Sequence, residues 1–295
     1  MPKSSLLHEL VSASAQRAPS SPALTSGRDS LSYHELDDQI AGLASGLIEL
    51  GIERGERVAI FLDKRIEAVV ASFAAARAGG AFVPVNPILK GEQIGHILRD
   101  CNARVLVTSP ERLPLLADTL NHCHDLRQVI LTGPLTKPVE LQSASLHQWS
   151  EVLASAPCAG HRVVDSDILS ILYTSGSTGR PKGVVLSHRN MVAGAKSVAS
   201  YLGNNQGDTL LAALPLSFDA GFSQLTTAFH SGARVVLLNY LLPQDVLKAM
   251  VKEKVTGLTA VPPLYIQLAQ LKWPETVTDH LRYFANTGGR MPLET

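Results

Sequence analysis

The stretch Tyr173-Thr-Ser-Gly-Ser-Thr-Gly-Arg-Pro-Lys-Gly183 places three glycines, four serine or threonine hydroxyls and one lysine within eleven positions, directly after a short apolar run. Glycines allow backbone N–H groups to approach an anion closely, and hydroxyl groups donate further hydrogen bonds to it. A lysine ammonium neutralises the charge that builds up on a departing phosphate group. The stretch therefore predicts a phosphate-binding loop that follows a buried strand.

Two other interpretations of this loop are weaker. A Walker-type P-loop needs glycine directly before the lysine and serine or threonine directly after it, whereas Pro181 and Gly183 flank Lys182 here. A flexible surface turn rich in glycine and serine would explain the composition without any ligand. That second interpretation stays open as the plain structural alternative.

Strand-like and helix-like runs alternate on both sides of the loop. We expect strands at 57–62, 82–85, 104–108, 128–132, 169–173, 209–214, 234–238 and 257–261, with helices at 65–78 and 92–100. Such alternation predicts an α/β fold with mainly parallel sheets and right-handed crossovers. Periodicity fades among the prolines and serines of residues 133–165. We therefore expect a first α/β lobe at 1–165 and a second at 166–295, which holds the phosphate loop.

A helix with a regular apolar stripe follows the loop. Its apolar positions Met191, Ala195, Val198 and Leu202 recur at intervals of four, three and four. Ser187 is the expected N-cap, and Gly203 is the expected stop.

Composition excludes several classes of function. Lys plus Arg and Asp plus Glu both number 26, so the chain lacks the basic excess typical of nucleic-acid binding. Its 3 cysteines do not form a disulfide framework, which favours a reducing, cytoplasmic location. The longest apolar run, Ala68 to Ala76, is too short to span a membrane.

The sequence YTSGSTGRPKG resembles the signature phosphate loop of the adenylate-forming (AMP-binding) superfamily, which includes acyl-CoA synthetases, amino-acid adenylation domains and luciferases. The resemblance covers essentially the whole chain. It includes Leu7-His-Glu-Leu10, Tyr33-His-Glu-Leu36, Gly79-Gly-Ala-Phe-Val-Pro-Val-Asn86, Leu214-Pro-Leu216 and Thr287-Gly-Gly289. It implies the two-lobed large domain of these enzymes. It also implies a reaction in which a carboxylate attacks the α-phosphate of Mg-ATP, releasing pyrophosphate, and a thiol then takes the acyl group.

The resemblance also implies site residues. The β- and γ-phosphates would be held by Thr174, Ser175, Gly176, Ser177, Thr178, Gly179, Lys182 and Gly183. Thr178 would lie closest to Mg²⁺, and Lys182 and Thr178 would act in catalysis. Gly288 and Gly289 would let adenine lie against the backbone, with Arg290 standing where the family often has glutamate. A tight turn after a strand is the structural alternative for these glycines.

The segment that resembles the family's acid-binding pocket contains Phe218, Asp219 and Phe222. In amino-acid adenylation domains a Phe-Asp pair here supplies a carboxylate for the substrate's α-amino group. Alternatively, Asp219 caps a helix expected at 220–229. The continuation Gly221-Phe-Ser-Gln-Leu225 is more similar to an acyl-CoA ligase subgroup associated with exosortase and exopolysaccharide loci. That likeness favours formation of a thioester with coenzyme A.

Other candidates have structural explanations. His122, Cys123, His124, Cys158 and His161 lack the paired spacing of a zinc site. The serine before His188 has no Gly-x-Ser-x-Gly elbow, and Gly207-Asp208 is far from the family's ribose-binding aspartate.

Further family motifs, a hinge and a small lid domain with a catalytic lysine would follow position 295. We therefore expect a large domain truncated before that lid and inactive alone. Three hypotheses stay open: an acyl-CoA ligase, an amino-acid adenylation domain that loads a carrier-protein phosphopantetheine, and a non-catalytic remnant that binds nucleotide weakly.

Overall fold

The computed structural model describes residues 4–175 and 181–292. The chain divides into two compact units, Met1–Glu9 with Asp37–Met191, and Leu10–Leu36 with Val192–Thr295. The units follow a different division from the lobes predicted at 1–165 and 166–295. The segment Leu10–Leu36 belongs to the second unit, and the strands on either side of the phosphate loop belong to the first.

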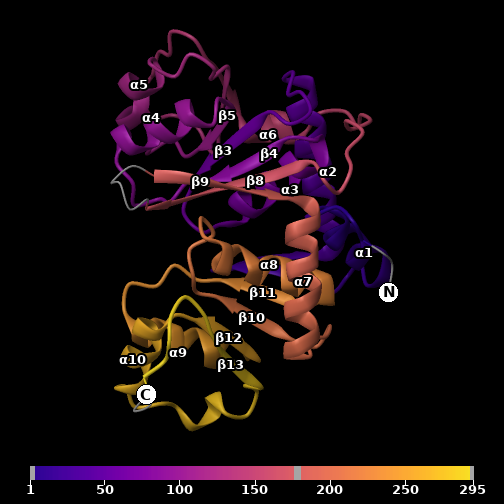
Figure 1. Ribbon diagram of the computed structural model, residues 1–295, viewed down its shortest axis with the longest axis vertical. Helices are drawn as coiled ribbons and strands as arrows, with labels where there is room; N and C mark the ends of the chain where they lie inside the picture. Colours follow the sequence, from indigo (N-terminus) through magenta and orange to yellow (C-terminus); the bar gives the residue numbers. More distant parts are fainter. Residues whose placement is uncertain (1–3, 176–180, 293–295) are drawn as a thin grey trace. The chain divides into compact units, whose positions relative to one another are not determined.

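The first unit is built around a seven-stranded sheet (Figure 1). Its strands are β3 (Arg57–Phe61), β4 (Ala81–Pro84), β5 (Ala103–Thr108), β6 (Gln128–Leu131), β7 (Ser145–Gln148), β8 (Ile168–Ser175) and β9 (Pro181–Ser187). The order is β7-β6-β5-β3-β4-β8-β9, and every neighbouring pair is parallel except β8 with β9. Its helices are α3 (Ile66–Ala78), α4 (Gly91–Asp100), α5 (Leu113–Leu120), α6 (Trp149–Leu153) and most of α2 (Tyr33–Glu49).

The second unit has a six-stranded sheet. Its strands are β1 (Pro22–Ser26), β2 (Asp29–Ser32), β10 (Thr209–Ala212), β11 (Arg234–Leu237), β12 (Gly257–Ala260) and β13 (Tyr283–Asn286). They lie in the order β13-β12-β10-β11-β1-β2, parallel except for β1 with β2. Its helices are α8 (Asp219–Ser231), α9 (Pro243–Lys252), α10 (Pro262–Ala269), the 3₁₀ turn Glu275–Val277, and most of α1 (Glu9–Arg17) and α7 (His188–Leu202). The predicted α/β fold with two mainly parallel sheets is confirmed.

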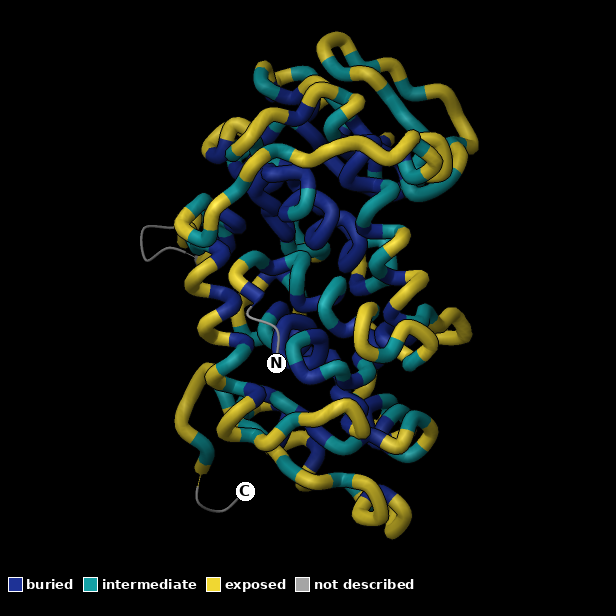
Figure 2. Tube along the Cα trace, turned by 90° about the vertical axis from the view of Figure 1, so that its right-hand side faces the viewer, coloured by how far each residue is buried: buried dark blue, intermediate teal, exposed yellow. Residues whose placement is uncertain are grey.

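Each unit has an apolar core beside its sheet, and Figure 2 shows that buried residues gather inside each unit. In the first unit, buried leucines and isoleucines of α4 and α5 pack against β5 and β6. In the second unit, Val246, Leu247 and Met250 of α9 belong to one buried cluster with Leu211 and Leu258 of the sheet. Both sheets are therefore held by side chains at helical spacing from the crossover helices.

The longest apolar run of the sequence forms a core helix. Residues 68–76 of α3 are all buried, because small alanines allow close packing on every side. The helix ends at Gly79, whose φ of +92° is the left-handed conformation that glycine adopts without strain. Among the described residues no helix is long and apolar enough to cross a membrane.

The other predicted ends of elements are close to those observed. Helix α7 begins at His188, directly after Ser187, and the Asn190 amide donates to Ser187 Oγ at 3.2 Å. Gly203, with a φ of +62°, follows its last turn. The expected cap and stop of this helix are confirmed. The sequence did not reveal β1, β2, β9, or the β7 and α6 elements within residues 133–165.

Candidate active site

The predicted phosphate loop connects the two strands of an antiparallel hairpin. Strands β8 and β9 pair in a register that sets Thr174 opposite Lys182 and Ser175 opposite Pro181. The predicted site residues between them, Gly176, Ser177, Thr178 and Gly179, lie outside the described residues. The structure therefore gives the two strands that carry the loop, and the roles assigned within it stay predictions.

Lys182 is exposed at the start of β9. Within residues 4–175 and 181–292, its ammonium makes no ion pair or hydrogen bond with another side chain. Thr174, opposite it, is also exposed. The hairpin therefore presents a cation that no described acidic side chain neutralises, opposite an exposed hydroxyl group, and both groups suit an anion.

Close packing on the hairpin holds the phosphate-loop strands in register. Tyr173 is 9% exposed, and its hydroxyl donates to Asp100 Oδ2 at 2.5 Å. Burial, together with this bond to a carboxylate, raises the pKa of Tyr173, so the hydroxyl stays protonated. Opposite it, a Cβ atom on Gly183 would lie 2.6 Å from Ile171 Cγ2 and 3.3 Å from Tyr173 Cζ. Glycine at position 183 is therefore required by packing, whether or not its amide binds phosphate.

The second unit contains a cavity of about 180 Å³. It lies among helices α7 and α8 and strands β10, β12 and β13, and Thr287 completes its lining. Helix α8 contributes Asp219, Ser223 and Thr227, which follow one another at intervals of four on one face. Exposure falls along this stripe, because Asp219 is exposed, Ser223 is intermediate and Thr227 is 2% exposed. The stripe therefore becomes more buried along the helix, whereas Tyr201 of α7, which also lines the cavity, is 70% exposed.

The predicted acid-binding residues separate in the structure. Asp219 lines the cavity, and it is the first residue of α8. Phe218 takes the N-cap position without a side-chain cap hydrogen bond, so the alternative that Asp219 caps the helix is wrong. Phe222 is fully buried in the core and is not among the residues that line the cavity, nor is Phe218, which is 39% exposed. Of the three predicted residues, the geometry supports only Asp219 as a contact for a ligand in this cavity.

The Thr287-Gly-Gly-Arg290 segment is a tight turn directly after β13. The Thr287 amide donates to Ala260 O at 3.1 Å, and Asn286 Nδ2 donates to Gly289 O at 2.7 Å. Gly288 has a φ of +76°, and a Cβ atom there would lie 3.2 Å from Val261 Cγ1. This backbone needs glycine at 288 on structural grounds. Adenine binding by Gly288, Gly289 and the exposed Arg290 stays a prediction.

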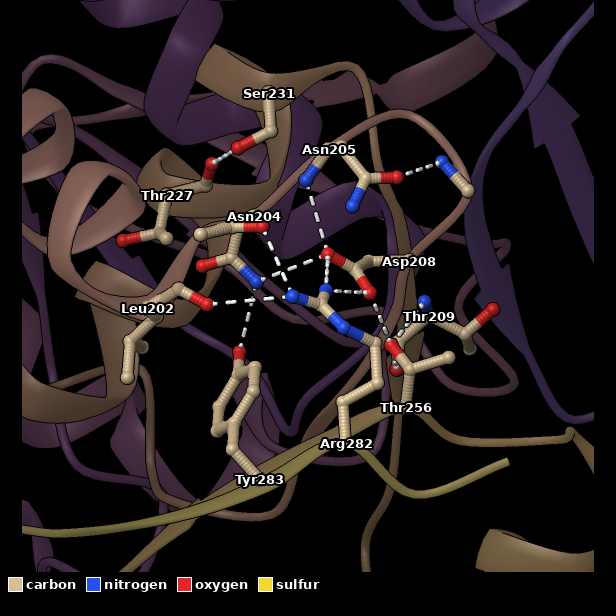
Figure 3. A network of polar contacts seen from close by, with 12 residues as sticks. Leu202, Asn204, Asn205, Asp208, Thr209, Thr227, Ser231, Thr256, Arg282 and Tyr283 are labelled. Atoms are coloured by element: carbon tan, nitrogen blue, oxygen red, sulfur yellow. Dashed lines mark hydrogen bonds and ion pairs between the residues drawn. The ribbon is translucent and has the colours of Figure 1, made fainter. Parts of the chain in front are cut away.

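A buried polar network lies beside the cavity (Figure 3). The Asp208 carboxylate, 1% exposed, accepts two hydrogen bonds at 2.5 Å from Arg282 Nη1 and one at 2.7 Å from Thr256 Oγ1. Asn204 Nδ2 donates both to Asp208 Oδ2 and to the hydroxyl of Tyr283, a cavity-lining residue. Burial opposes ionisation of Asp208, but these hydrogen bonds outweigh it and lower its pKa. The Asp208 carboxylate is thus engaged in hydrogen bonds within the protein. Through Asn204 the network also holds Tyr283 in place in the wall of the cavity.

His188 has a structural role. It is 1% exposed, and the Leu7 amide donates to its Nδ1 atom at 3.0 Å. Burial lowers its pKa to about 4 against the opposing effect of nearby carboxylates such as Asp167. His188 is therefore neutral at physiological pH and serves as an acceptor for the N-terminal segment. Among the described residues no group of three or more His, Cys, Asp or Glu side chains could hold a metal ion.

Sequence reasoning missed most of the cavity. Ser223, Gln224, Thr227, Thr259 and Tyr283 line it, and none was proposed as a site residue. One signal was available, because Asp219, Ser223 and Thr227 recur at intervals of four in the helix at 219–231 and so share one face. Residues on β12 and β13 gave no such signal, because their approach to α8 depends on the tertiary fold.

Comparison with known proteins relates this arrangement to nucleotide-dependent enzymes. A family model described as AMP-binding enzyme matches residues 11–295. Surfactin synthase subunit 2 of Bacillus subtilis (strain 168) is 30% identical over 272 residues, covering 91% of this chain and 7% of that protein. Nonribosomal peptide synthetase 8 of Aspergillus fumigatus is 32% identical over 231 residues, covering 78% of this chain and 2% of that protein. The chain thus spans a small part of the curated relatives it matches.

A solved structure shares the fold. The anthranilate CoA ligase AuaEII in complex with anthranoyl-AMP matches with a TM-score of 0.84 and 23% identity, over 96% of this chain and 54% of that one.

Proposed function

This chain belongs to the AMP-binding enzyme family, and from that premise we propose that it serves the ATP-dependent activation of a carboxylic acid, followed by thioester formation with coenzyme A. In the first step a carboxylate oxygen attacks the α-phosphorus of ATP. The bond from that phosphorus to the bridging oxygen breaks, and pyrophosphate leaves. In the second step a thiol sulfur attacks the acyl carbon, and AMP leaves with the bonding electrons while the thiol proton passes to solvent or a base.

The observation that carries this proposal is the exposed ammonium of Lys182 at the end of the β8–β9 hairpin. It has no counter-ion among the described side chains, so its charge is available to the triphosphate. Charge-assisted hydrogen bonds of this kind contribute about 1.5–3 kcal/mol each. Lys182 would therefore favour bound ATP and stabilise the charge that develops on pyrophosphate.

The hairpin supplies the remaining phosphate contacts in this proposal. Thr174 and Ser175 end β8, and Gly183 follows Lys182 in β9. Their backbone and hydroxyl donors would hold the β- and γ-phosphates together with the residues at 176–179. Mg²⁺, when bound, would neutralise phosphate charge, with the hydroxyl of Thr178 as the proposed protein ligand.

An amino acid is the second candidate substrate, and Asp219 favours it. This carboxylate is exposed and lines the cavity, and within residues 4–175 and 181–292 no side chain pairs with it. A substrate α-amino group would supply the missing cation. The acceptor thiol would then belong to a carrier-protein phosphopantetheine instead of coenzyme A. The nonribosomal peptide synthetase among the relatives is consistent with this alternative.

Binding of Mg-ATP tests the proposal. Ligand-observed NMR titration, which detects weak complexes, would compare the chain with Lys182→Ala and with Lys248→Ala, an exposed lysine on α9 as a matched control. We expect weak binding that Lys182→Ala reduces by about 10-fold or more, because one charge-assisted contact is lost. Binding that is equally strong in both variants would refute the role of Lys182. Absence of binding in the unmodified chain would favour a non-catalytic remnant.

Acid-dependent exchange of pyrophosphate into ATP separates the two substrate classes. Fatty, aryl and amino acids would be offered in turn to a longer family member that carries the same cavity residues. Exchange confined to amino acids would replace the acyl-CoA ligase proposal with the alternative.

A further inference from the structure

We propose that helix α4 positions the β8–β9 hairpin for phosphate binding, and that Asp100 and His96 are the residues through which it acts. Asp100 holds β8 through the hydroxyl of Tyr173, and His96 holds β9 at the carbonyl of Pro181. The inference rests on the proposed function, since it assumes that the hairpin binds the triphosphate of ATP. It adds two positioning residues that lie outside the loop itself.

The two faces of the β8–β9 hairpin carry different side chains. Thr174 pairs with Lys182, and Tyr173 pairs with Gly183. Residues that pair directly share a face of a sheet, and successive residues of a strand alternate between the faces. Thr174 and Lys182 therefore lie on one face, and the Tyr173 ring lies on the other. A helix that holds the hairpin from the Tyr173 face leaves the Lys182 ammonium accessible to phosphate.

Helix α4 packs on the Tyr173 face of the hairpin. Tyr173 belongs to one buried cluster with Ile97 and Leu98 of this helix. The helix is itself held closely against α5, because a Cβ atom on Gly95 would lie 2.5 Å from Thr119 Cγ2. Helix α4 is therefore a firmly packed element against which the hairpin can be positioned.

Two polar contacts join α4 to the two strands. The Tyr173 hydroxyl donates to Asp100 Oδ2 at 2.5 Å, and His96 Nε2 lies 3.4 Å from Pro181 O. A carbonyl oxygen only accepts, so the second contact requires the histidine tautomer with its proton on Nε2. His96 and Asp100 lie on one face of the helix, about 6 Å apart along its axis. The contacted positions are about 7 Å apart along the hairpin, because Pro181 pairs with Ser175, two residues after Tyr173.

The Tyr173 ring transmits the effect of Asp100 to β9. A Cβ atom on Gly183 would lie 3.3 Å from Tyr173 Cζ, the carbon that bears the hydroxyl, so the ring rests against the backbone of Gly183. Gly183 follows Lys182, and the hydrogen bond to Asp100 fixes the ring above it. Asp100 is the last residue of α4, where a carboxylate opposes the helix dipole. Its charge therefore favours the hydrogen bond to Tyr173 and does not stabilise the helix.

The affinity of variants for Mg-ATP tests the proposal. It is measured by ligand-observed NMR titration of the whole chain, at a temperature at which every variant is folded. Tyr173→Phe keeps the ring and removes the hydroxyl, and Asp100→Ala removes the acceptor. We expect each to weaken Mg-ATP binding by about fivefold, because small displacements of binding groups are costly. Their combination should bind no more weakly than either alone, because both break the same hydrogen bond. His96→Phe should weaken binding by about twofold, because its contact is long.

A rescue variant and two controls distinguish positioning from a loss of stability. An asparagine oxygen can accept from Tyr173, so Asp100→Asn should recover most of the affinity that Asp100→Ala loses. Asp125→Ala and Tyr33→Phe are the matched controls. Asp125 belongs to an ion pair of the first unit, and the Tyr33 hydroxyl donates to Ala233 O at 2.7 Å in the second unit. Neither contact involves the hairpin, so both controls should keep their affinity for Mg-ATP even where thermal stability falls.

The outcomes separate this inference from the proposed function. Mg-ATP binding that is as tight in Tyr173→Phe and Asp100→Ala as in the unmodified chain would overturn the inference alone. Equal losses in the two controls, or an Asp100→Asn variant that recovers nothing, would overturn it as well. Unchanged binding in His96→Phe would remove His96 from the proposal. Absence of Mg-ATP binding in the unmodified chain overturns the proposed function and this inference with it.

Discussion

Replacing Asp208 by asparagine should destabilise the second unit in a way that depends on pH. The substitution keeps the side-chain shape but removes the negative charge that pairs with Arg282. Asp208 is 1% exposed, so its partners are arranged around a charge that water does not reach. An asparagine oxygen still accepts from the Asn205 amide, which donates to Asp208 Oδ2 at 2.9 Å. The amide NH2 then replaces Oδ1, so the hydrogen bond that Thr256 Oγ1 donates is lost together with the ion pair.

The magnitude follows from the burial of the two partners. Breaking a fully buried pair by removing one partner costs about 3–5 kcal/mol, because the remaining charge is left unpaired and dry. The Arg282 side chain is 40% exposed, so water partly hydrates it once the carboxylate is gone. We therefore expect Asp208→Asn to lower the free energy of unfolding by about 2–3 kcal/mol at pH 7.

The pH dependence has a definite sign. Hydrogen bonds from Arg282 and its neighbours outweigh burial and lower the pKa of Asp208 in the folded protein. A carboxyl with a lowered folded pKa contributes stability above its unfolded value of about 3.9, and this contribution is lost as pH falls through the folded pKa. The difference between the parent and Asp208→Asn should therefore be constant from pH 7 to 5 and shrink below about pH 4.

Urea unfolding at pH 7, 5 and 3 measures these differences, with unchanged m-values as the check on a common unfolded state. Asp165→Asn is the control, because Asp165 and Arg189 form an exposed pair and little change is expected. A loss below about 1 kcal/mol at pH 7, or a difference that persists undiminished at pH 3, would refute the reasoning about Asp208.

Three further changes test other parts of the structure. His188→Asn keeps an acceptor for the Leu7 amide but cannot titrate. Because burial lowers the pKa of His188 from 6.5 to about 4, the free energy of unfolding of the parent should fall by about 3 kcal/mol relative to this variant between pH 6.5 and 4. Urea unfolding across this pH range measures the difference, and parallel stability profiles of the two proteins would contradict the prediction. Gly183→Ala should lower the free energy of unfolding by about 1–3 kcal/mol, because the added Cβ atom clashes with Ile171. In a protein that already carries Ile171→Ala the same substitution should cost less, and an equal cost in both backgrounds would argue against the clash. Gly288→Ala should lower the midpoint of thermal unfolding by the equivalent of about 1–2 kcal/mol, because its φ of +76° strains an alanine, and an unchanged midpoint would exclude that strain.

Much of the fold was predictable because buried parallel strands have continuous apolar sequences. The runs at 57–62 and 104–108 lie within a residue or two of β3 and β5. Strand β9 escaped prediction because four of its seven residues are exposed, and β2 because its sequence, Asp-Ser-Leu-Ser, has no buried position. The hydrophobic pattern of the sequence does not reveal such strands, because they are held mainly by hydrogen bonds to adjacent strands.

Long-range pairing explains the remaining differences. Strand β1 pairs with β11, which lies about two hundred residues later in the chain, so chain order alone could not assign it to the second unit. The cavity had the same limitation. Asp219 was identified from a motif. Gln224 and Thr227 line the cavity only because folding brings β10 and β12 next to α8. Motifs reveal residues that are adjacent in the sequence, and the structure adds those brought together by folding.

The central claim is that the β8–β9 hairpin binds the triphosphate of ATP. The most direct measurement records backbone amide chemical shifts of the isotope-labelled chain during titration with Mg-ATP and, separately, with adenosine. We predict that the amides of Thr174, Lys182 and Gly183 shift with Mg-ATP and do not shift with adenosine, which has no phosphates. Mg-ATP binding that leaves these three amides unchanged, or equal shifts with adenosine, would contradict the claim.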